Sequence, residues 1–222
     1  MKLALITLLP FLGAVFPVFS IRYGRNACAA LAGAFTLAAL VLLLGEAPAV
    51  YRGEVPAWGV DWLAPVGLRF SFFLDGLGLF FATLILGIGL LIILYARFYL
   101  DSRNPMGVFY TYLLLFQGAM VGIALSNNVL MMLVFWELTS LSSFLLIGYW
   151  RHLPEARQGA RMALAVTGGG GLCLIAGMLL LGHIAGSYEL GEILARGEVV
   201  KASPLYAPAL VLILLGAFTK SA

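Results

Sequence analysis

The stretch Phe135-Trp136-Glu137-Leu138-Thr139-Ser140-Leu141-Ser142-Ser143 places one carboxylate in the middle of an apolar run, residues 129–150. A run of about twenty apolar residues is long enough to cross a bilayer as a helix. At about 1.5 Å per residue, Glu137 lies near the middle of the membrane. A charge at that depth costs roughly 2.5–3.5 kcal/mol on insertion scales, so we expect Glu137 to face protein or water and to be functional.

The composition indicates the class of protein. Of the 222 residues, 63% are hydrophobic and only 10% are charged, and the mean hydropathy is +1.05. A soluble domain carries about 25% charged residues. The chain is therefore predicted to be an all-α, polytopic membrane helix bundle that contacts the lipid bilayer. It has no basic cluster interleaved with exposed aromatic residues, which argues against binding to nucleic acid.

Metal and redox chemistry find little support. The two cysteines, Cys28 and Cys173, both fall inside apolar runs, and the sequence has no CxxC motif and no histidine pair at ligand spacing. These patterns argue against zinc, iron–sulfur and haem sites. We expect no metal and no cofactor, so energy conversion in this chain would use protons or ions.

Seven transmembrane helices are predicted, at about residues 3–20, 27–44, 74–100, 108–125, 129–150, 162–183 and from 205 onward. The first run is less well explained as a signal peptide, because Pro10 and Pro17 interrupt it and Arg22 and Arg25 follow directly. The last run reaches residue 222 with no flanking charge beyond Lys220 and no cap. We therefore expect a truncated last helix, and residues 1–222 to be the amino-terminal part of a longer membrane domain.

Three longer polar segments separate the predicted helices. Residues 45–71 combine prolines and glycines with Trp58 and Trp62, which predicts an ordered extracytoplasmic loop, including a short hairpin, with the tryptophans near the headgroups. Residues 151–161 are rich in arginine and are expected to form a short interfacial segment. Residues 187–203 have helical spacing of apolar residues and should lie along the membrane surface.

Loop charges predict the orientation. The end opposite the amino terminus has short loops that carry seven arginines: Arg22, Arg25, Arg97, Arg103, Arg151, Arg157 and Arg161. Most acidic loop residues lie at the other end. By the positive-inside rule, the arginine-bearing end is predicted to be cytoplasmic and the amino terminus to be outside.

Once the loops and the ends of the spans with Arg97 and His183 are set aside, three ionisable residues remain: Asp75, Glu137 and Lys220. Asp75 precedes a helix, so a carboxylate favoured by the helix dipole is the simpler interpretation, and proton or ion entry is the alternative. Glu137 has hydroxyl neighbours at Thr139 and Ser140, which are candidate accessory groups. Lys220 lies deep in the last helix, and anchoring at the interface is its alternative role.

A buried acid and a buried lysine in one bundle suggest a proton relay. Desolvation disfavours the charged form of each group and mutual attraction favours it, so a change in their separation changes their proton occupancy. His183 is a further candidate accessory group, although it is expected to be solvated. The GxxxG at Gly118 and Gly122 and the four-glycine run at residues 168–171 are interpreted as helix-packing devices.

The sequence resembles a known family. FWELTSLSSFLLIGYW at residues 135–150 resembles the fifth-helix signature of the large A-type subunit of Mrp-type (Mnh-type) multisubunit sodium/proton antiporters. RFSFFLDGLGLFF at residues 69–81, NPMGVFYTYLLLFQGAMVGIALSNN at residues 104–128 and GAFTKSA at residues 216–222 resemble the same subunit, in the same order. The wider kin are the antiporter-like subunits of respiratory complex I and of membrane-bound hydrogenases.

The resemblance implies that Glu137 and Lys220 are paired proton-translocation residues, and that the partners are other membrane subunits, sodium ions and protons. The residues after 222 would then hold further lysines and an inverted repeat. Two other functions remain open at this point. One is a proton-translocating subunit of a complex I-like or hydrogenase-type redox complex, and the other is a structural scaffold for partner membrane subunits.

Overall fold

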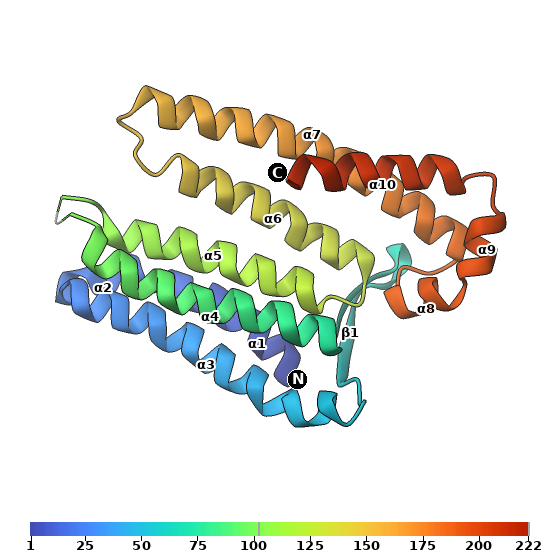
Figure 1. Cartoon of the computed structure of the whole chain (residues 1–222), viewed down its shortest axis with the longest axis horizontal. Helices are drawn as coiled ribbons and strands as arrows, with labels where there is room; N and C mark the ends of the chain where they lie inside the picture. The colour runs from blue at the N-terminus through green and yellow to red at the C-terminus, as the bar shows by residue number, and fades with distance from the viewer. Residues whose placement is uncertain (102, 222) are drawn as a thin grey trace.

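The protein is a bundle of long helices with a small β-hairpin at one end (Figure 1). This computed structural model describes residues 1–101 and 103–221. Within those residues, six helical segments are long and apolar enough to cross a membrane: Lys2–Tyr23, Arg25–Tyr51, Gly76–Tyr99, Met106–Leu125, Val129–Ile147 and Pro154–Ala185. A seventh apolar helix, Tyr206–Lys220, is shorter. The predicted helical membrane bundle is confirmed, and residue 222, up to which the last span was predicted to run, lies outside the described residues.

Neighbouring helices along the chain form most of the bundle. The first segment consists of α1 (Lys2–Val15), α2 (Pro17–Ser20) and a 3-10 turn, and it is followed by α3 (Arg25–Tyr51), α4 (Gly76–Tyr99) and α5 (Met106–Leu125). Next come α6 (Val129–Ile147), α7 (Pro154–Ala185) and α10 (Tyr206–Lys220). Helix α5 packs against α1, α4 and α6, while α7 packs against α6 and α10 (Figure 1).

The hairpin closes one end of the bundle. Strands β1 (Ala57–Leu63) and β2 (Leu68–Phe73) pair antiparallel, as the predicted short hairpin requires. The predicted loop boundaries, 45 and 71, differ from the structure, because residues 45–51 are helical and β2 continues to Phe73. Buried Ala47 keeps the end of α3 packed on the core, and Pro48 removes only one backbone donor there.

Residues 151–161 are helical for most of their length, because α7 begins at Pro154, and their expected place at the membrane interface stays a prediction. Proline is well suited to the first turn of a helix, and Glu155 in that turn is favoured by the helix dipole. The polar segment 187–203 does contain helices, α8 (Leu190–Ala195) and α9 (Gly197–Ala202).

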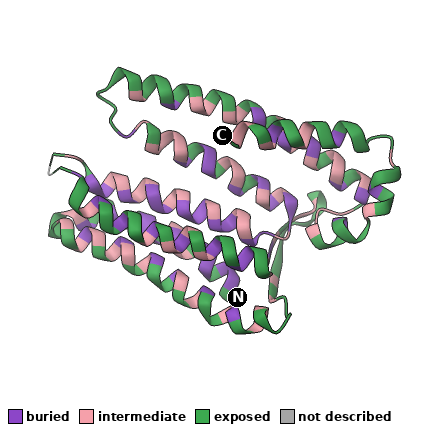
Figure 2. Ribbon diagram, viewed as in Figure 1, coloured by how far each residue is buried: buried purple, intermediate pink, exposed green. Residues whose placement is uncertain are grey.

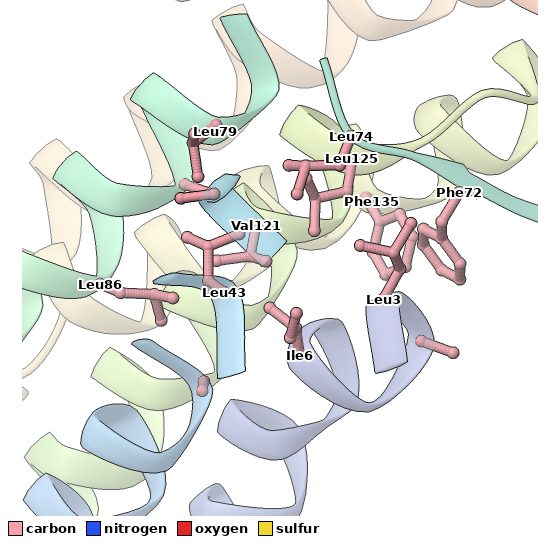
Figure 3. Close-up of a cluster of buried hydrophobic side chains, with 14 of the residues drawn as sticks. Leu3, Ile6, Leu43, Phe72, Leu74, Leu79, Leu86, Val121, Leu125 and Phe135 are labelled. Carbon is pink, nitrogen blue, oxygen red and sulfur yellow. The ribbon is translucent and has the colours of Figure 1, made fainter. Parts of the chain in front are cut away.

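The core lies where α1, α3, α4, α5 and α6 meet the hairpin. Phe72 of β2 and Phe135 of α6 are buried there, with ring centroids 6.3 Å apart (Figure 3). Outer faces of α4, α7 and α10 are exposed along their length (Figure 2). They carry large apolar side chains such as Leu91, Leu172 and Phe218. Such faces suit lipid or further protein, as expected for a bundle that lies within a bilayer.

Candidate functional site

Packing of Phe135 sets the direction in which Glu137 points. Phe135 is buried in the core and faces Gly122 of α5, where a Cβ atom would overlap its ring. Two residues along an α-helix correspond to a rotation of about 200°. Glu137 therefore points away from that core and toward α7.

The Glu137 carboxylate lies against the backbone of α7. Its Oε1 atom is buried and has no hydrogen-bond partner among the residues that the structure describes. A Cβ atom at Gly171 would overlap Oε1, so the glycine leaves the space that the carboxylate occupies. Glu137 and Ser140 also line a mostly apolar cavity of about 620 Å³ between α6 and α7, which Leu164 and Ile175 complete from the α7 side.

Lys220, the last residue of α10, reaches the same part of α6. Its Nζ atom donates to Thr139 Oγ1 at 2.7 Å and to the Trp136 carbonyl oxygen at 3.4 Å, and it lies 5.4 Å from the centroid of the Trp136 ring. Thr139 Oγ1 in turn donates to the Trp136 carbonyl oxygen at 2.7 Å. Lys220 thus binds the residues on either side of Glu137, although the ion pairs of the described residues do not include a Glu137–Lys220 pair.

Close packing of α10 on α7 brings Lys220 to this position. A Cβ atom at Gly216 of α10 would lie 2.7 Å from the Gly170 carbonyl oxygen, and one at Gly170 would overlap Thr219. The predicted packing role of the glycine run 168–171 is thereby confirmed at Gly170. Gly170 admits α10 and Gly171 admits the Glu137 carboxylate, whereas Cβ atoms at Gly168 and Gly169 would meet nothing within 4 Å.

The remaining predicted residues lie in other surroundings. The Asp75 carboxylate accepts from the Gly78 backbone N–H at 2.7 Å and caps α4, which confirms its simpler interpretation. Ser140 donates to the Trp136 carbonyl oxygen at 3.4 Å and shares the Glu137 cavity. His183 is exposed near the end of α7 and lines a separate cavity beside the hairpin. A part for Asp75 or His183 in proton transfer stays a prediction.

Sequence reasoning missed the polar network that holds the start of α6. The Glu189 carboxylate accepts from Ser71 Oγ at 2.8 Å, from Asn127 Nδ2 at 2.6 Å and from Asn128 Nδ2 at 2.9 Å. Asn128 also caps α6 by accepting from the Met131 backbone N–H. The network joins the hairpin, the α5–α6 turn and the segment before α8. An asparagine directly before an apolar run is an N-cap signal that could have predicted the cap.

Metal binding gains no support from side-chain clustering. Within residues 1–101 and 103–221, no three His, Cys, Asp or Glu side chains gather in a way that could hold a metal ion. The expectation that the chain needs no metal or cofactor stays a prediction.

Known proteins resemble this chain in sequence. Residues 126–222 match the family model described as NADH:quinone oxidoreductase/Mrp antiporter, TM, and residues 62–110 match NADH-Ubiquinone oxidoreductase (complex I), chain 5 N-terminus. The chain is 45% identical over 220 residues to a probable K(+)/H(+) antiporter A/B subunit of Rhizobium meliloti, covering 99% of this chain and 22% of that protein. It is 40% identical over 221 residues to the Na(+)/H(+) antiporter A-type subunit of Alkalihalophilus pseudofirmus, covering 97% of this chain and 27% of that protein. The chain belongs to the family of Mrp antiporter A-type subunits and complex I antiporter-like subunits.

Solved structures agree with this membership. The Mrp-family chain aligns with a chain of the Mrp complex from Dietzia sp. DQ12-45-1b with a TM-score of 0.84 and 32% identity, covering 100% of this chain and 24% of that one. It also aligns with a chain of the membrane-bound sulfane sulfur reductase, an archaeal respiratory membrane complex, with a TM-score of 0.81. That second likeness, at 17% identity over 99% of this chain and 34% of the other, shows a shared fold alone. The Mrp-family chain spans 22% and 27% of the length of the Rhizobium and Alkalihalophilus proteins.

Proposed function

We propose that this chain belongs to a membrane subunit of a cation/proton antiporter complex in the bacterial plasma membrane, and that Glu137 and Lys220 lie on its proton path. The main observation behind this proposal is that Lys220 contacts Thr139 and Trp136, which flank Glu137 on α6. The identities of 40% and 45% to antiporter subunits support the exchange activity.

The geometry suggests how the pair could move a proton. Lys220 Nζ is held by a neutral hydroxyl and a carbonyl, while one oxygen of Glu137 has no partner in the described residues. If Lys220 moved from Thr139 to Glu137, two opposite charges about 4 Å apart would attract each other by about 4 kcal/mol at an effective dielectric constant of 20. Making or breaking that contact changes the proton occupancy of both groups. A membrane potential couples to such a step at about 2.3 kcal/mol per charge per 100 mV.

Sodium is the proposed cation, with potassium as the second choice. One relative is named as part of a Na(+)/H(+) antiporter, and the other as part of a probable K(+)/H(+) antiporter. The proposed partners are other membrane subunits, in line with the multisubunit Mrp complex of Dietzia. The outer location of the amino terminus also remains a proposal, carried by the arginine-rich loops at the opposite end.

Replacement of Lys220 tests the proposal. We would express the complete complex in bacteria that lack their own antiporters and measure the collapse of a pH gradient in everted vesicles when sodium or potassium is added. Lys220→Ala should lower exchange by about 100-fold or more, as expected for the loss of a proton-transfer group. Lys201→Ala is the matched control, because Lys201 is exposed and forms its ion pair, within the described residues, with the nearby Glu198 on α9.

The outcome separates the three functions. An assembled Lys220→Ala complex that exchanges ions at the wild-type rate contradicts the proton-path role and favours the scaffold. Proton movement that requires an electron donor rather than a cation gradient favours the redox-driven alternative. Loss of exchange with either cation, at unchanged assembly, supports the antiporter.

A further inference from the structure

A cavity of about 490 Å³ lies beside the turn between α6 and α7. This turn is at the end of the bundle opposite the hairpin (Figure 1). Three arginines line the cavity: Arg151 in the turn, and Arg157 and Arg161 on α7. Its apolar wall includes Phe144 and Leu145 from the last turn of α6 and the buried Ala160 of α7. This volume is within the range of cavities that bind small molecules.

The positive charge of this cavity is not neutralised within the described part of the chain. Arg157 and Arg161 are four residues apart on one face of α7, where like charges repel. None of the ion pairs among the described residues includes any of the three arginines. Arg151 Nη2 donates to the neutral Tyr112 hydroxyl at 2.6 Å. An anion bound among the three guanidinium groups would relieve this repulsion.

The apolar wall indicates what kind of anion fits. Phe144 and Leu145 belong to a helix that is long and apolar enough to cross the membrane, so the cavity joins the end of a hydrocarbon span to a cationic rim. A free phosphate ion would contact the arginines of the rim only. A phospholipid would contact the arginines through its phosphate and the apolar wall through an acyl chain. Guanidinium groups bind phosphate oxygens through paired hydrogen bonds, and basic pockets between membrane helices are suited to anionic headgroups.

We propose that this cavity is a binding site for one anionic phospholipid. Its headgroup phosphate lies among Arg151, Arg157 and Arg161, and the start of one acyl chain lies along Phe144 and Leu145. The bound lipid bridges the end of α6 and the start of α7. These are the two helices that hold Glu137 and Gly171, so occupancy would fix their spacing at this end of the bundle.

Lipid retention by the purified complex tests the site. The intact complex would be extracted in mild detergent, depleted of lipid, and titrated with short-chain phosphatidylglycerol or with phosphatidylcholine of the same chain length, while native mass spectrometry counts the lipids that remain bound. The double variant Arg157→Gln, Arg161→Gln removes two of the three charges. Arg22→Gln is the matched control, because Arg22 is an exposed arginine at the same end of the bundle and lies outside the cavity.

One phosphatidylglycerol should bind the wild type and the Arg22 variant equally, and the double variant roughly 30-fold more weakly, from about fivefold per arginine. Millimolar inorganic phosphate should not displace the lipid. Equal retention by the double variant, equal binding of phosphatidylcholine, or displacement by inorganic phosphate would each overturn the proposal. The last two comparisons use the wild-type complex, so they remain decisive even if the double variant fails to assemble.

Discussion

Alanine substitutions along the glycine run of α7 should separate helix packing from proton-path geometry. Cβ atoms at Gly168 and Gly169 would meet nothing within 4 Å, whereas a Cβ atom at Gly171 would overlap the Glu137 carboxylate. Glycine is about 0.8–1.0 kcal/mol less favourable than alanine in a helix interior. Gly168→Ala and Gly169→Ala should therefore leave function intact and keep or raise the thermal stability.

Alanine at the last two positions of the run, Gly170 and Gly171, should have different effects on stability. Gly171→Ala overlaps the end of a flexible side chain, so the carboxylate moves while the helices stay in place, and stability should change by less than about 1 kcal/mol. Gly170→Ala would place its Cβ atom 2.5 Å from the Thr219 Cβ atom, beside the backbone of α10. Because α10 must then shift, overpacking should cost about 1–3 kcal/mol and should also displace Lys220.

Thermal unfolding of the purified complex and cation-driven exchange in vesicles are the two measurements. Gly171→Ala should lose most of its exchange activity at a near-normal unfolding temperature. Gly170→Ala should lose exchange activity and also unfold at a lower temperature. The reasoning is refuted if Gly171→Ala transports like Gly168→Ala, since the carboxylate then does not need the position that the glycine leaves open.

Three further predictions follow from single contacts. Thr139→Val removes the hydroxyl that accepts from the lysine of α10, a bond to a charged group of about 1.5–3 kcal/mol, so exchange should fall roughly tenfold or more, whereas Thr139→Ser should keep it. Asn128→Ala removes the N-cap of α6 and should cost about 1–2 kcal/mol, seen as a lower unfolding temperature; an unchanged temperature would contradict the role of the cap. Gly67 and Gly53 both have positive φ, but only at Gly67 would a Cβ atom also meet Tyr188, at 2.7 Å. Gly67→Ala should therefore destabilise the hairpin end more than Gly53→Ala, and equal melting curves would count against this contact.

Hydropathy predicted the spans because the membrane demands apolar runs of a set length. Hydropathy was less accurate at the ends of helices, because local packing and capping residues determine where a helix begins and ends. Residues 45–51 continue α3, since Ala47 is buried against the core. Arg157 and Arg161 belong to α7, since Pro154 starts that helix earlier than the change in hydropathy suggests.

Sequence reasoning named Glu137, Lys220 and the hydroxyl neighbours Thr139 and Ser140, but it did not predict which of these side chains contact one another. Glu137 stands out because a carboxylate inside an apolar run is costly, and Lys220 stands out for the same reason. Lys220 donates a hydrogen bond to Thr139 and not to Glu137, because of the way α10 crosses α7. No local pattern specifies that crossing, because it depends on how closely Gly170 and Gly216 approach. Gly171 had no signal that distinguished it from its three glycine neighbours.

Cation-driven proton flux through Glu137→Gln tests the central claim most directly. The assembled complex would be reconstituted into liposomes with an internal pH dye, and flux would be started by a sodium gradient and, separately, by a potassium gradient. Glu198→Gln is the control, because the Glu198 side chain is 92% exposed on α9. Glu137→Gln should abolish the flux with either cation while the control retains it. Wild-type flux through an assembled Glu137→Gln complex would contradict the claim that this carboxylate carries the proton.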